Sequence, residues 1–139
     1  MISESDRRRI KSHLMVWWIV WAGILGMVCA VYFIFTKNKP LPPAASAELL
    51  LNIAGFVPLF VSVIIRWLVL PRYSDPVRAF VVFIIGLSLA DACSMFGIFI
   101  GGGYRDALFM LGVLGIIQYA PFYARRFFEP KVTGFIPNN

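Results

Sequence analysis

Long uncharged apolar runs alternate with short islands of charge along this chain of 139 residues. About 20 apolar residues, at a helical rise of about 1.5 Å each, cross the hydrocarbon core of a bilayer. The charged residues that bracket the runs therefore delimit four predicted transmembrane helices, at about residues 14–36, 49–70, 79–100 and 105–124. The second helix reaches residue 70 only if Arg66 extends its guanidinium group outward to the lipid headgroups. The pattern predicts an all-α integral membrane protein with one membrane domain over residues 1–139.

Basic residues are concentrated on one side of these predicted helices. Ten Lys and Arg residues precede the first span, separate the second from the third or follow the fourth, whereas three lie in the other two loops. Cytoplasmic loops retain Lys and Arg, so we expect both termini to be cytoplasmic, in a membrane of the bacterial inner type. Topology and contact with anionic membrane lipids account for the net charge of +6, which requires no nucleic-acid partner. A docking surface for a soluble partner is the alternative.

The remaining composition adds little chemistry. Hydrophobic residues make up 60% of the chain, and both cysteines, Cys29 and Cys93, fall inside predicted spans, with no disulfide framework and no metal-ligand spacing. The last residues, 127–139, are too few to cross a membrane. We expect this tail to lie along the membrane surface or against a partner.

Asp91 is the one acidic residue inside the third predicted span. An ionisable side chain at bilayer depth is costly, so by default it indicates a functional site. Helical spacing brings Ser88 and Ser94 near it, and Pro58 frees the carbonyl of Ala54 on the preceding helix. These groups could solvate a protonated acid, or a carboxylate with a bound cation such as sodium, so proton or sodium binding at Asp91 is one interpretation. The other interpretations are a neutral acid that fixes helix packing and an ion pair with a partner subunit. No other cofactor and no metal site are expected.

Small residues at helical spacing predict close helix contacts, because lipid removes the hydrophobic drive for helices to associate. Such stripes occur in the first and third spans: Ala22, Gly26 and Ala30, and then Gly86, Ala90, Gly97 and Gly101. The contacts are expected within the chain or between copies of it. A channel lining is the alternative.

Aromatic residues near the span ends predict interfacial anchors, since indole and phenol rings favour the headgroup level. The tryptophans concerned are Trp17, Trp18, Trp21 and Trp67. A quinone or pigment site stacked on tryptophans is the functional alternative. His13 is the only histidine, which excludes a bis-histidine haem site within one chain.

One segment resembles a known family. The run Ala90-Asp91-Ala92-Cys93-Ser94-Met95-Phe96-Gly97 is similar to the carboxylate motif of the F-type ATP synthase proteolipid, the c subunit, and residues 48–100 resemble its helical hairpin loosely. The resemblance implies that Asp91 corresponds to the proton- or sodium-binding carboxylate. The chain departs from the family in its loop, which reads Leu70-Pro71-Arg72, in the low glycine content of the second span and in the two further spans.

No pair of titratable side chains shares a span, and no nucleophile has a base within reach in the sequence pattern, so we expect no enzyme activity. Two functions remain. The first is a non-catalytic accessory or scaffold subunit of a homo-oligomer or of a larger membrane complex. The alternative is an ion-binding component of a transport or energy-coupling system that uses Asp91.

Overall fold

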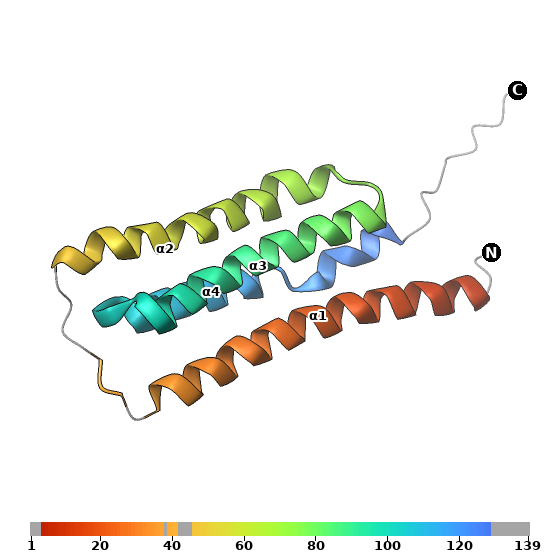
Figure 1. Ribbon diagram of the computed structural model, residues 1–139. Helices are drawn as coiled ribbons and strands as arrows, with labels where there is room; N and C mark the ends of the chain where they lie inside the picture. Colours follow the sequence, from red (N-terminus) through yellow and green to blue (C-terminus); the bar gives the residue numbers. More distant parts are fainter. Residues whose placement is uncertain (1–3, 38, 42–45, 129–139) are drawn as a thin grey trace, which may run out of the picture.

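The computed structural model describes residues 4–37, 39–41 and 46–128, and within them it contains helices and no strand (Figure 1). The α-helices are α1 (Glu4–Thr36), α2 (Ser46–Ile64), α3 (Pro76–Ile100) and α4 (Arg105–Ile117). The shorter helices are the π-helix η1 (Ile65–Val69) and the 3-10 helices η2 (Leu70–Arg72), η3 (Gly102–Tyr104) and η4 (Pro121–Phe127). The all-α prediction is confirmed, and most of the predicted surface tail lies outside the described residues.

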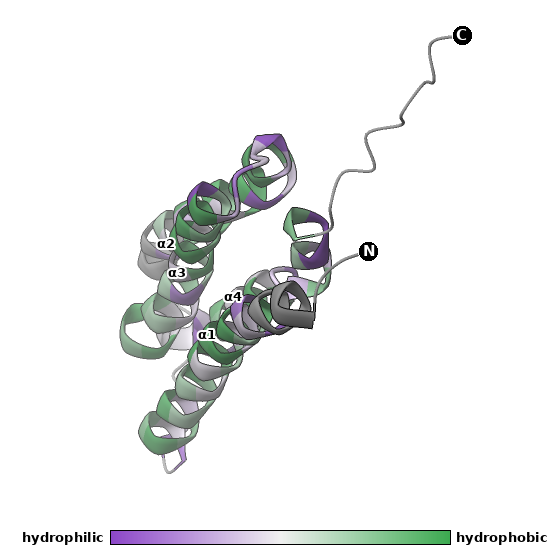
Figure 2. Cartoon of the chain, turned by 90° about the vertical axis from the view of Figure 1, so that its right-hand side faces the viewer, coloured by the Kyte–Doolittle hydropathy of each residue, from purple (hydrophilic) through white to green (hydrophobic). Residues whose placement is uncertain are grey.

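Four helical segments of the described chain are long and apolar enough to cross a membrane. They cover Lys11–Thr36, Asn52–Arg72, Pro76–Ile100 and Gly102–Phe127. Their outward faces carry large apolar side chains, such as Ile34 at 73% exposure and Val77 at 70%, and Figure 2 shows hydrophobic residues along the lengths of the helices. A soluble protein rarely exposes apolar surface on this scale, whereas lipid chains solvate it. Four apolar spans are therefore confirmed.

α3 is the central helix, in contact with α1, α2 and α4. In Figure 1 the four α-helices lie roughly along one direction and form a bundle, with α1 on its outer side. α1 is attached at both halves, since the ring of His13 stacks on Phe128 at 5.8 Å and that of Tyr32 stacks on Phe109 at 3.9 Å. The start of α1 and the end of η4 thus lie at the same end of the bundle, which we call the basic end.

Local signals set the start and the end of α3. The carboxylate of Asp75 accepts hydrogen bonds from the backbone amides of Val77 and Arg78, both at 3.3 Å, and Pro76 occupies the first helical turn. At the other end Gly102 has a φ of 48°, a conformation that glycine adopts without steric cost. This turn sends the chain directly into α4.

The fourth apolar segment is not one continuous α-helix. The sequence predicts a span over residues 105–124, but α4 ends at Ile117 and the 3-10 helix η4 begins at Pro121. Proline has no amide hydrogen and its ring clashes with the preceding helical turn, which explains the break. α2, in contrast, runs through Pro58 as a helix and becomes irregular further on, in η1.

Candidate functional site

Asp91 lies on α3 and is partly exposed, but its Oδ1 atom is buried and has no hydrogen-bond partner among the described residues. The ion pairs that the described side chains form lie elsewhere, between Arg78 and Asp75 and between Arg105 and Asp106. A carboxyl group at bilayer depth requires a proton, a cation or a hydrogen-bonding partner. Among the described residues, none supplies a hydrogen bond to the Oδ1 atom of Asp91.

Neither of the two serines predicted beside Asp91 forms a hydrogen bond with its buried Oδ1 atom. Ser88 is exposed. Ser94 is buried, and its hydroxyl donates to the carbonyl oxygen of Phe109 on α4 at 3.3 Å. Ser94 therefore serves the contact between α3 and α4.

The carbonyl that Pro58 was expected to free is also remote from Asp91. Its residue, Ala54, is exposed on α2. α2 contacts α3 where Gly55 lies against the ring of Phe96. A Cβ built on Gly55 would be 2.7 Å from Cδ1 of Phe96. At about 100° per residue, Asp91 is turned by about 140° from Phe96 around α3. The group that the sequence assembles around Asp91 is therefore not brought together, and ion binding there stays a prediction.

The small residues of α3 are used inside the chain. Gly86 lies against the ring of Tyr119, and a Cβ on Gly97 would be 2.7 Å from Cβ of Leu108. Ala90 faces Gly115, where the corresponding distance is 3.1 Å, and a Cβ on Gly101 would be 3.1 Å from the Cα of Arg105 at the start of α4. These contacts let α3 and α4 approach closely, as small residues permit in membrane helices.

The small residues of α1 are not used inside the chain. Ala22, Gly26 and Ala30 are all exposed. A Cβ on Gly26 would meet no atom within 4 Å, and the same holds for the nearby Gly23. The stripe that the sequence predicts as a helix contact thus lies open on the outer face of α1.

Only part of the predicted tryptophan belt faces outward. Trp67 is 63% exposed and Trp18 is partly exposed, but Trp17 is 3% exposed and packs against Phe83 with ring centroids 4.8 Å apart. Trp21 donates its indole N–H to the carbonyl oxygen of Ile116 at 2.9 Å. Trp17 and Trp21 therefore hold α1 to the bundle, a role that the sequence did not distinguish from interfacial anchoring.

The break between α4 and η4 is held by two neighbouring residues of the π-helix. The Nε of Arg66 donates to the backbone oxygen of Gln118 at 2.8 Å, and the indole N–H of Trp67 donates to Oε1 of the same residue at 3.1 Å. The Gln118 oxygen lacks a helical donor because the amide of Phe122 turns to Ala120 at 2.8 Å. A backbone oxygen that a helix break leaves without its helical donor needs another partner, and here that partner is a cationic side chain.

A second set of hydrogen bonds joins three helices just beside this break. The hydroxyl of Tyr119, which is fully buried, donates to the carbonyl oxygen of Ser62 at 2.6 Å. The hydroxyl of Ser62 in turn donates to the carbonyl oxygen of Gly86 at 2.7 Å. The absent side chain at Gly86 makes room for the phenol ring. α2, α3 and the break after α4 are therefore locked together.

Two guanidinium groups share one aromatic ring at this place. The Cζ of Arg66 lies 3.9 Å from the ring centroid of Tyr123, and that of Arg126 lies 5.9 Å from it. Arg66 is thus half-buried, with its Nε bound inside the bundle, and its extension to the headgroups stays a prediction. The Gln118 carbonyl and the face of Tyr123 hold the guanidinium group by a hydrogen bond and by cation–π attraction.

The sequence pattern does not predict this cluster, although it contains one signal of it. Pro121 lies within the fourth apolar run, where it must disturb the helical hydrogen bonds as Pro58 was expected to do in the second. Nothing in the sequence, however, pairs Gln118 with Arg66, because 52 residues separate them. That pairing is a product of the tertiary structure.

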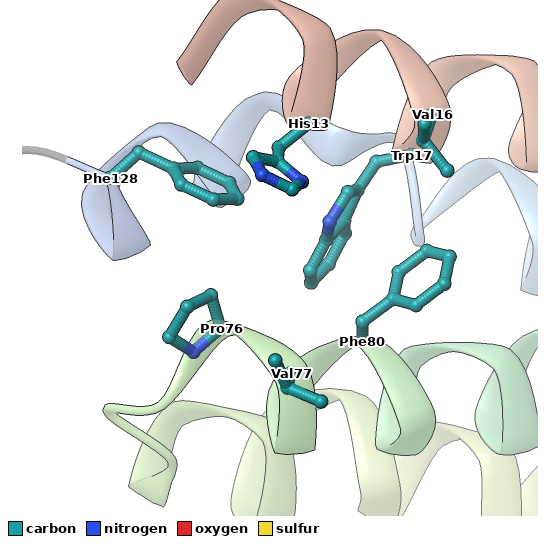
Figure 3. A pocket seen from close by; sticks show the side chains of 7 residues that line it. All are labelled: His13, Val16, Trp17, Pro76, Val77, Phe80 and Phe128. Atoms are coloured by element: carbon teal, nitrogen blue, oxygen red, sulfur yellow. The ribbon is translucent and has the colours of Figure 1, made fainter. Parts of the chain in front are cut away.

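A separate groove of about 240 Å³ opens at the basic end between α1, α3 and the end of η4. Figure 3 shows the rings of Trp17, Phe80 and Phe128 around it, with the imidazole of His13 lying parallel to Phe128. Its walls are mostly apolar. Nothing in the structure identifies an occupant for this groove.

Comparison of the chain with protein-family models, with curated proteins and with solved structures finds no match. Within the described residues, no three His, Cys, Asp or Glu side chains gather in a way that could hold a metal ion. The chemistry of the chain has to be argued from its own side chains.

Proposed function

We propose that this chain is a non-catalytic subunit of a membrane assembly, in which the open small-residue face of α1 packs against a helix of a second copy or of another membrane subunit. In the same proposal the four spans are inserted in a bacterial inner membrane with both termini cytoplasmic. The charge asymmetry of the loops supports this orientation, because ten of the thirteen basic residues fall on one side of the spans.

The observation that carries the proposal is the contrast between α3 and α1. Both helices have small residues at helical spacing, but those of α3 contact α4 and the η4 region, whereas Gly26 has no atom within 4 Å of a Cβ built on it. Glycine costs about 1 kcal/mol relative to alanine in a helix interior, and lipid contact alone gives no return for that cost. A close helix neighbour offsets that cost, because the two backbones can approach at glycine and gain packing contacts.

The test is Gly26→Leu, with Met27→Phe as the matched control. Met27 is 50% exposed at the same depth of α1 but on a different face, so both changes add bulk toward the outside. Since Gly26 has no neighbour within the chain, the leucine is expected to leave the fold intact and to abolish association. Association is measured by the mass of the protein and its co-purifying subunits after extraction into lipid nanodiscs. A wild-type chain that is monomeric and without partners, or a Gly26→Leu variant that still associates, contradicts the proposal.

A second candidate function is ion binding at Asp91, which the buried and unpartnered Oδ1 atom favours. Asp91→Asn keeps the shape of the side chain and removes its charge. If Asp91 carries a proton or sodium ion, this variant assembles normally but loses ion-dependent function, and a hydrophobic carbodiimide modifies the wild-type residue unless sodium is present. If the acid only fixes packing, the carbodiimide does not react in the native protein.

A further inference from the structure

The cluster around Tyr123 contains more hydrogen-bond donors than acceptors. Arg66 uses its Nε on Gln118, and its two Nη groups donate to no described residue. The hydroxyl of Tyr123 and the Nε2 of Gln118 are buried and likewise have no partner among the described residues. The Gln118 amide is oriented by the indole of Trp67, which donates to Oε1 and so leaves Nε2 as the unused donor.

The cluster also carries positive charge that no acidic side chain described by the structure balances. Arg126 lies over the same ring as Arg66 and reaches the carbonyl of Leu70 only at 3.5 Å. The acids whose side chains the structure describes lie elsewhere: Asp75 pairs with Arg78, Asp106 pairs with Arg105, and Asp91 forms no described ion pair. A half-buried guanidinium group such as that of Arg66 is normally paired with an anion, and the exposed Arg126 beside it adds a second positive charge. Both the charge and the unused donors therefore call for an oxyanion.

The surroundings of the cluster indicate which oxyanion is at hand. Trp67 is 63% exposed and Phe122 is 75% exposed, so aromatic rings face outward on both of the elements that bear the cluster. Exposed aromatic rings of this kind lie at the headgroup level of a membrane. The cluster is also at the basic end, where the positive-inside rule places the leaflet that carries anionic lipids. Arginine matches phosphate by its planar set of donors.

We propose that Arg66 and Arg126 bind the phosphate of an anionic phospholipid at the break between α4 and η4. Arg66 supplies its Nη groups, held in place by the bond from its Nε to Gln118, and Arg126 supplies the second charge from η4. This proposal rests on the membrane insertion proposed above, but it does not depend on association through α1. The two proposals can therefore fail separately.

The test compares two adjacent arginines. Arg125 and Arg126 are both exposed on η4, but only Arg126 lies over Tyr123 and Phe127. Arg126→Gln and Arg125→Gln remove the same charge from the same turn, so Arg125→Gln is the matched control. The full-length protein in a neutral detergent is titrated with phosphatidylglycerol and, separately, with phosphatidylcholine of the same chain length. Bound lipid is counted by native mass spectrometry, and thermal unfolding reports whether each variant is folded.

The expected result is a preference of the wild-type chain for phosphatidylglycerol, which Arg126→Gln weakens by about five- to tenfold and Arg125→Gln by less than about twofold. Arg66→Lys keeps the charge but not the planar donors, and is expected to weaken binding as well. Equal losses from the two glutamine variants would mean diffuse attraction without a site. Binding of phosphatidylcholine with equal affinity would also overturn the proposal.

Two further experiments distinguish a bound phospholipid from other anions at this site. Inorganic phosphate at millimolar concentration is expected not to displace phosphatidylglycerol, because the lipid is held by its chains as well; displacement would assign the site to soluble phosphate. Glu129 is the acid nearest to Arg126 in sequence, and Glu129→Gln is expected to leave lipid affinity within about twofold. A tenfold increase would mean that this carboxylate occupies the site. Loss of a co-purifying protein from Arg126→Gln, with lipid binding unchanged, would assign it to a partner's acid.

Discussion

The contact between α3 and α4 is close enough that one methyl group should separate the two helices. A Cβ added at Gly112 would meet the hydroxyl oxygen of Ser94, would lie 2.6 Å from the backbone nitrogen of Ser94 and 3.0 Å from the carbonyl oxygen of Ala90. A side-chain hydroxyl can rotate away, but two backbone atoms cannot. Gly112→Ala therefore forces α4 away from α3 over this turn.

The size of the effect follows from three opposing contributions. Alanine favours the helix by about 1 kcal/mol relative to glycine. Overpacking costs about 1–3 kcal/mol, and displacement of Ser94 loses its hydrogen bond to Phe109, worth about 1 kcal/mol. Gly112→Ala is thus expected to lower the free energy of unfolding by about 1–3 kcal/mol. At Gly23, where no atom lies within 4 Å, the same substitution keeps only the helix term and is expected to stabilise the chain by up to about 1 kcal/mol.

The assay is unfolding in mixed micelles, in which the fraction of sodium dodecyl sulfate is raised and helix content is followed by circular dichroism. Gly23→Ala is the internal control, because it makes the same chemical change in an exposed helix. The reasoning is refuted if Gly112→Ala and Gly23→Ala shift the unfolding midpoint in the same direction. A stabilised Gly112→Ala variant would mean that α3 and α4 are not in contact at this turn.

Two further predictions concern tyrosine hydroxyls. Tyr119→Phe removes the donor to the Ser62 carbonyl. It should lower the free energy of unfolding by about 0.6–1.7 kcal/mol, the range for hydrogen bonds between membrane helices. Tyr73→Phe is the control in the same micelle assay and should change the free energy little, because the Tyr73 hydroxyl has no described hydrogen bond. Tyr32→Phe removes the bond to Oδ1 of Asp106 at 2.9 Å but keeps the stack on Phe109. It should speed amide exchange in the second half of α1 and leave α3 unchanged; an equal increase in both helices would contradict the peripheral placement of α1.

Some of the site was within reach of the sequence and some was not. The cost of a charge in lipid singles out Asp91 from composition alone, and the small-residue stripes of α1 and α3 are visible as spacings. Which stripe is used is not visible, because Gly26 and Gly86 have the same helical setting in the sequence and differ only in what lies opposite. The partners of Arg66 are not visible for the same reason, because Gln118 and Tyr123 are distant from it in the chain.

The sequence by itself determined the class and the number of spans of this protein, because burial in lipid is decided by the local density of apolar and charged residues. It also determined the start of α3, where Asp75 and Pro76 act on the backbone next to them. Only the tertiary structure decided that Arg66 holds the break after Gln118 and that α1 keeps an open face. Those outcomes depend on which helices meet, and hydrogen bonds between helices leave no periodic trace in the chain.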